Sequence, residues 1–191
     1  MIRDLVTSKT RVKILSLFLD NKEDMFHVRE VVRRVDEEIN SVRRELLLLE
    51  KKGILQKEPR ANRVYYYLDK TYPFHNDLIR INSKMTGLGG GIVKNRAKLG
   101  KIKYAMISGK FARGNKENPE EIDLLVVGTV VIPELSLIVR EEEGKRKQEI
   151  NYTVMSEEEF NFRKKRRDPF IMGIINGSRI MLIGDEDSMI S

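Results

Sequence analysis

The chain has 191 residues, of which 40% are hydrophobic and 34% are charged, and its formal net charge is +7. It contains no cysteine, which excludes a disulfide framework, a thiol nucleophile and any Cys-ligated metal site. No apolar run reaches the ~18 residues of a membrane span and the first residues lack the apolar segment of a signal peptide, so we expect a cytoplasmic protein without a membrane partner.

The charge is distributed unevenly along the chain. Residues 1–70 hold 16 Lys and Arg against 12 Asp and Glu, and residues 71–104 hold 7 against 1. Residues 105–191 hold 13 basic against 16 acidic residues. The basic front of the chain is therefore expected to meet a polyanion, with a solvated basic surface that has no partner as the alternative.

The first 70 residues alternate between helical and extended patterns. Helices are predicted where apolar residues recur every three or four positions, over residues 8–20, 29–34 and 39–52. Extended segments are predicted over residues 25–28, 54–59 and 63–69. Between the last two, Arg60-Ala61-Asn62 is typical of a hairpin turn with a basic tip.

The order of three helices and a hairpin resembles the winged helix-turn-helix domains of small bacterial and archaeal regulators. The stretch from Leu46 to Leu55, which contains Leu-Glu-Lys-Lys-Gly-Ile-Leu, is similar to the end of the recognition helix and the start of the wing in that family. The resemblance implies that helix 39–52 enters the major groove of double-stranded DNA and that the wing reaches the backbone or the minor groove.

The resemblance also implies which residues meet DNA and how the protein assembles. The candidate DNA-binding residues are Asn40, Ser41, Arg43, Arg44, Arg60 and Arg63. For Arg43 and Arg44 a plain solvated helix face is the alternative. A homodimer is expected because such regulators usually bind paired half-sites.

Residues 71–99 are expected to link two domains. A loose helical pattern extends to Thr86, and Gly87-Leu88-Gly89-Gly90-Gly91 then predicts a flexible hinge. A phosphate-binding loop is the less favoured alternative, because no Gly-Lys-Ser/Thr follows. The sequence thus predicts a winged-helix domain over residues 1–70 and a second domain over residues 100–191.

Two segments organise the second domain: Ser108 to Gly114, and Glu121 to Gly128. Strands are predicted over residues 102–107, 122–127, 148–155 and 179–183, with helical segments between them. Glu121 and Asp123, two positions apart, would lie on one face of a strand. Two carboxylates on a buried face indicate a metal ion, a basic partner or a raised pKa.

The pattern Gly-x-Phe-Ala-Arg-Gly followed by acidic-Ile-Asp-Leu resembles the nucleotidyltransferase superfamily that includes DNA polymerase beta, especially its minimal members. The resemblance covers roughly residues 100–185 and implies a mixed sheet flanked by helices, so we expect the α+β class for the whole chain. It implies that Gly109, Lys110, Arg113 and Gly114 bind the nucleotide. It also implies Glu121 and Asp123 as metal ligands and, together with Glu149 as the candidate third carboxylate, as the catalytic residues.

Two positions depart from the family pattern, and both weaken metal binding. Lys110 stands where the family has Ser, and it offers the acidic site an internal counter-ion. Glu121 stands where the family has Asp, which moves a carboxylate by on the order of an ångström in a site where Mg²⁺ demands near-ideal geometry.

These departures favour a DNA-binding transcriptional regulator whose second domain is inactive and serves sensing or assembly, with no required cofactor. The first alternative is an active nucleotidyltransferase that uses Mg²⁺ and a nucleoside triphosphate. The second alternative is an interaction module of toxin–antitoxin type with a small protein partner.

Overall fold

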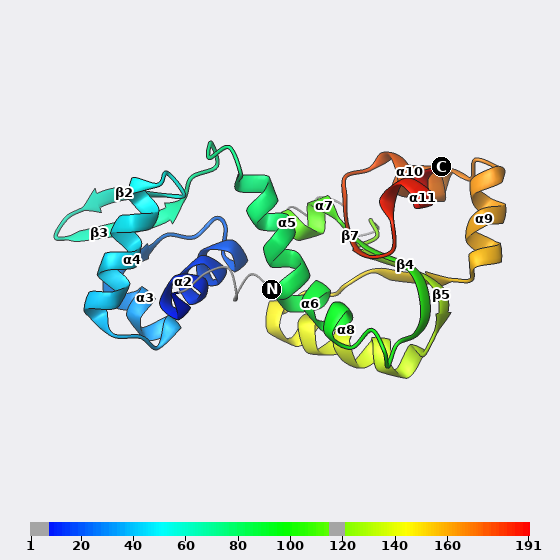
Figure 1. Cartoon of the computed structure of the whole chain (residues 1–191), viewed down its shortest axis with the longest axis horizontal. Coiled ribbons are helices and arrows are strands. Elements are labelled where there is room, and N and C mark those ends of the chain that lie inside the picture. Colours follow the sequence, from blue (N-terminus) through cyan, green and yellow to red (C-terminus); the bar gives the residue numbers. More distant parts are fainter. Residues whose placement is uncertain (1–7, 115–120) are drawn as a thin grey trace. The chain divides into compact units, whose positions relative to one another are not determined.

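The computed structural model describes residues 8–114 and 121–191 (Figure 1). The chain divides into two compact units, and the boundary falls between Asn82 and Ser83. Each unit combines helices with a sheet of its own. The predicted α+β class is therefore confirmed.

The first unit begins with three helices and a small antiparallel sheet. Its elements in chain order are α2 (Lys9–Asp20), β1 (Phe26–His27), α3 (Val28–Val35), α4 (Ile39–Lys51), β2 (Leu55–Arg60) and β3 (Arg63–Leu68). The strands lie in the order β1-β3-β2, and the β2–β3 hairpin extends out from the helices (Figure 1). The predicted order of elements is confirmed, with element ends that differ by one or two residues.

An aliphatic core holds these helices together. Val42, Leu46 and Leu49 recur at helical spacing on α4, and all three side chains are buried. Other buried side chains of this unit include Phe18 of α2 and Phe26 of β1. The rings of these two residues meet edge to face, with centroids 5.4 Å apart. One face of α4 is therefore committed to the core, and the opposite face is left to solvent.

The hairpin turn is shorter than predicted. Arg60 pairs with Arg63 across the strands, so Ala61 and Asn62 alone make the turn. Ala61 has a φ of 50°, in the left-handed region that two-residue hairpin turns require. Both arginines consequently belong to the ladder and lie at its tip.

The second unit is built on a four-stranded mixed sheet. After α5 (His75–Met85), which spans the boundary, its elements are α6 (Gly87–Lys94), β4 (Gly100–Ser108), α7 (Gly109–Arg113), β5 (Leu124–Val130), α8 (Ile132–Arg146), β6 (Tyr152–Met155), α9 (Glu157–Lys165), α10 (Pro169–Asn176), β7 (Arg179–Ile183) and α11 (Glu186–Ile190). The strand order is β6-β5-β4-β7. Only the β5–β6 pair is parallel among the described strands.

Two predicted strands start later than expected. The strand predicted over 122–127 begins at Leu124, so Glu121 and Asp123 precede it. The strand predicted over 148–155 begins at Tyr152, so Glu149 lies outside it. Both shifts move the candidate carboxylates from the strands to the segments that lead into them.

The glycine-rich segment is helical, which corrects the predicted hinge. Gly87 to Lys94 form α6. A Cβ at Gly89 would overlap the backbone carbonyl of Ser83, and a Cβ at Gly91 would lie 2.7 Å from Cγ2 of Ile138 on α8. The glycines therefore allow close packing of this helix, and contacts outweigh their low helix propensity.

Candidate functional site

The solvent face of α4 presents a row of polar and basic side chains. Asn40, Arg43 and Arg44 are exposed and Ser41 is half-buried. Their spacing of three and four residues places Asn40, Arg43 and Arg44 on one side of the helix, opposite the buried core positions. Within the described chain, neither Arg43 nor Arg44 is ion-paired with an acidic side chain; Arg44 Nη2 lies 3.5 Å from Ser41 Oγ.

The N-terminus of α4 is held by an acidic cap. Glu38 Oε2 accepts a hydrogen bond from the backbone N–H of Ser41 at 2.9 Å. The backbone N–H groups of Asn40 and Ser41 lower the pKa of Glu38, because they stabilise its ionised form. The cap fixes the first turn of the helix, where the candidate DNA-binding residues begin.

The tip of the hairpin carries the two candidate wing arginines, and both are exposed. Arg60 Nε donates to Glu58 Oε1 at 2.8 Å, and its guanidinium lies 5.9 Å from the centre of the Tyr65 ring. Arg63 Nη1 lies 3.4 Å from His27 Nε2. The charge of Arg60 is therefore partly balanced by Glu58 before any partner arrives.

Glu45, which the sequence analysis does not single out, ties α4 to α2. Its side chain accepts hydrogen bonds from Ser8 Oγ at 2.6 Å and from Arg11 Nε at 2.8 Å. The residue is 6% exposed, and burial raises its pKa, but the bonds from Ser8 and Arg11 outweigh burial and leave the pKa below its ordinary value. A charged residue within the apolar stripe of a helix is the signal that identifies such a position from sequence.

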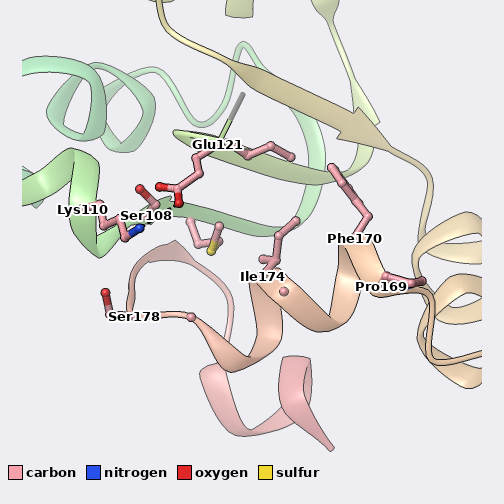
Figure 2. Close-up of a pocket in the computed structure, with 11 residues that line it drawn as sticks. Ser108, Lys110, Glu121, Pro169, Phe170, Ile174 and Ser178 are labelled. Atoms are coloured by element: carbon pink, nitrogen blue, oxygen red, sulfur yellow. Dashed lines mark hydrogen bonds and ion pairs between the residues drawn. The ribbon is translucent and has the colours of Figure 1, made fainter. Parts of the chain in front are cut away.

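A pocket of about 400 Å³ opens in the second unit beside α7 and α10 (Figure 2). It has a polar wall and an apolar wall. The residues that line it are Met106, Ser108, Lys110, Glu121, Ile122, Pro169, Phe170, Gly173, Ile174, Gly177 and Ser178. The pocket brings together parts of the two segments that organise this domain and adds α10, which no sequence motif connects with the site.

An ion pair lies on the polar wall of the pocket. Lys110 Nζ is 2.7 Å from Glu121 Oε1, and the two side chains point toward one another in Figure 2. Their side chains are 43% and 38% exposed, so solvent screens the pair and it contributes little stability. The structure thus supplies the internal counter-ion that the sequence predicts for Glu121.

The other predicted nucleotide-binding residues have structural partners. The backbone N–H of Gly109 donates to the carbonyl oxygen of Ser178 at 2.7 Å, and a Cβ on Gly109 would overlap the Ser178 side chain. Arg113 Nη2 donates to Ser178 Oγ at 3.0 Å. Gly114, with a φ of 76°, caps α7 in the left-handed region. Of the four predicted residues, Lys110 is the one among the pocket's lining.

The three candidate carboxylates do not form a common site. Asp123 is 2% exposed, and its Oδ2 accepts the backbone N–H of Asn151 at 2.9 Å. Glu121 is paired with Lys110, and Glu149 is exposed in the segment before β6. No three His, Asp or Glu side chains gather closely enough to hold a metal ion within the described ranges. The arrangement therefore does not fit the two-metal centre that the resemblance implies.

Among known proteins, no family model and no curated protein matches this chain. A solved structure, reduced HlyU from Vibrio cholerae N16961, is similar over 41% of this chain and 75% of its own, with 20% identity and a TM-score of 0.34. A likeness this low carries no argument about fold or function. In the part of the chain that the structure describes, every helix is too short or too polar to cross a membrane.

Proposed function

We propose that this chain is a DNA-binding transcriptional regulator of winged-helix type whose second unit serves sensing or assembly. The observation that carries the proposal is the exposed face of α4 with Asn40, Arg43 and Arg44. An α-helix fits the major groove, where Arg pairs with guanine and Asn with adenine through paired hydrogen bonds. The opposite face of the helix is buried in the core, so the reading face is rigidly supported.

The hairpin supports the same proposal by a different contact. Arg60 and Arg63 lie together at its exposed tip, at a place where a wing meets phosphates or the minor groove. Such contacts position the protein and carry little sequence information. We infer a homodimer that reads two half-sites, because a single helix contacts only a few base pairs.

The Lys110–Glu121 ion pair favours sensing or assembly over nucleotidyl transfer in the second unit. The Lys110 ammonium group lies 2.7 Å from Glu121 Oε1, at a position where a metal ion would otherwise bind this carboxylate. Asp123 is engaged by the Asn151 backbone. With Glu149 exposed elsewhere, the residues present do not make the three-carboxylate centre on which the transfer chemistry of the family depends.

Fluorescence anisotropy of labelled duplexes tests the proposal. The duplexes are DNA from upstream of the gene for this protein and a scrambled version, each measured over a series of salt concentrations. We expect the native duplex to bind about 10³-fold more tightly at physiological salt. Replacing Arg43 and Arg44 with Ala should remove most of this preference, whereas replacing Arg60 and Arg63 should weaken both duplexes alike and reduce the salt slope by about 2.

Arg96→Ala with Lys98→Ala is the matched control, because it removes two exposed cations from the second unit. This variant should retain the preference for the native duplex. Equal binding of the two duplexes by the unmodified protein, at every candidate site and with a steep loss in salt, would leave only backbone electrostatics and overturn the proposal.

A further inference from the structure

We propose that the pocket of the second unit binds a small amphipathic anion: an aromatic or aliphatic body that carries one carboxylate or sulfonate group. The proposal deepens the sensing role proposed above and rests on it for its biological purpose. The pocket volume, about 400 Å³, lies in the range of small-molecule sites, which combine apolar walls with a few polar groups.

The apolar wall provides the surface that such a body would cover. Met106 of β4 and Ile122, which precedes β5, are among the lining residues. Pro169, Phe170 and Ile174 contribute from α10 (Figure 2). Phe170 is 39% exposed, so a large ring remains open to water beside the pocket. Burial of apolar area against these side chains is the favourable term for a ligand with an apolar body.

The polar wall selects the charge of the ligand. Among the described residues that line the pocket, Lys110 is the one basic side chain, and its partner Glu121 balances it. A ligand with a single negative charge can pair with Lys110 Nζ in place of Glu121, whose side chain is 38% exposed and can turn its carboxylate to water. Because the existing pair is screened by solvent, this exchange costs little. A triphosphate would place several negative charges beside this one ammonium group, so it suits the polar wall less well than a ligand with a single charge.

The glycine at position 173 allows a clean test of occupancy. Gly173 lies in α10 and lines the pocket, and a Cβ there would have no heavy atom within 4 Å. The first carbon of a new side chain therefore meets no neighbour, and Gly173→Leu adds apolar volume at the lining of the pocket. Gly144 of α8 is the matched control, because a Cβ there would also meet open space and the residue does not line this pocket. Leu is a better helix former than Gly at both positions, so both variants should fold.

The experiment titrates the full chain, without DNA, with anilinonaphthalene sulfonate, a fluorescent aromatic sulfonate. The measured quantity is the dissociation constant of the tightest-binding site for the probe. We expect Gly173→Leu to weaken this binding by about tenfold or more, and Gly144→Leu to leave it unchanged. Lys110→Met should also weaken binding by about tenfold, because a charge-assisted hydrogen bond is lost. Glu121→Gln should strengthen binding, because it removes the competing carboxylate.

Unchanged probe binding in Gly173→Leu or in Lys110→Met would overturn the proposal, since the probe would then be on another apolar surface. Competition decides the chemical class: octanoate should displace the probe, and displacement by Mg²⁺–ATP but not by octanoate would reject the proposed ligand. The titration contains no DNA, so the two proposals can fail separately. If DNA recognition fails but the probe binds as expected, the regulator proposal is rejected and the ligand proposal stands. If DNA recognition is intact but Gly173→Leu binds the probe unchanged, only the ligand proposal is rejected.

Discussion

At the scale of single residues, Glu45 shows how a buried charge positions α4, the helix that we propose faces DNA. The carboxylate is buried against Ser8 and Arg11 of the neighbouring segment. Burying a charge is costly unless it is paired and hydrogen-bonded, and here both conditions are met. The pair therefore fixes the position of α4 against α2 and leaves the opposite side of α4 free of core contacts.

Glu45→Gln should destabilise the first unit by about 1–3 kcal/mol near neutral pH, because Arg11 loses its charged partner. The pKa of Glu45 in the folded state lies below its ordinary value of 4.5. Its contribution is therefore complete above about pH 4.5 and is lost as the pH falls through the folded pKa. Urea unfolding of the protein and the variant from about pH 7 down to about pH 3 measures the difference in unfolding free energy.

The difference between the two proteins should stay constant above about pH 5 and shrink below it. Lys145→Met is a suitable control, because its partner Glu141 is an exposed side chain of α8, where an ion pair contributes little. A difference that grows on acidification would contradict the assignment of the stabilisation to the ionised form of Glu45.

At the scale of elements, α6 shows a helix formed because of its glycines. Gly89 is buried, and a Cβ there would overlap the Ser83 carbonyl. Leu88 and Ile92 of the same helix are fully buried. The close approach of the backbones and the burial of these two side chains together offset the low helix propensity of the segment. The pattern that indicates a hinge in isolation thus becomes a packed element.

Gly89→Ala should destabilise the second unit by about 1–3 kcal/mol, because the added methyl group has to displace a backbone carbonyl. Gly144→Ala, in the exposed part of α8, should instead stabilise it by about 0.5–1 kcal/mol, because alanine is the better helix former and meets no neighbour. Chemical denaturation of both variants compares the two effects. A flexible hinge at residues 87–91 would instead make Gly89→Ala neutral.

At the scale of the whole molecule, each unit has a core of its own. Phe18, Leu46 and Leu55 are fully buried in the first unit, and Leu125 and Phe160 are fully buried in the second. The boundary at residues 82 and 83 separates these two sets of side chains. A chain with two such cores is expected to unfold as two cooperative units.

Calorimetry of the full chain should therefore show two transitions. Glu45→Gln should lower the melting temperature of one transition and Gly89→Ala that of the other, and hydrogen exchange with mass spectrometry should assign each transition to its residues. One cooperative transition that both variants lower equally would mean that the chain unfolds as one body.

The fold of the first unit was predictable to within a residue or two because its determinants are local. The spacing of Val42, Leu46 and Leu49 indicates a helix, and the Arg60-Ala61-Asn62 segment indicates a turn. These signals depend on neighbours within one or two helical turns, where the chain itself fixes the distances. The candidate DNA-facing residues follow directly, because they lie on the face of α4 that the buried apolar stripe does not include.

The site in the second unit depended on residues far apart in the chain. The sequence alone determined that Lys110 and Glu121 could neutralise one another; the tertiary structure decided that they do, that Glu149 lies apart, and that Phe170 and Ile174 complete a pocket beside them. Strand pairing sets which distant side chains meet, and β6 begins four residues later than predicted, which leaves Glu149 outside the strand. Periodicity in the sequence determines the elements and their faces, whereas packing between elements decides which faces meet.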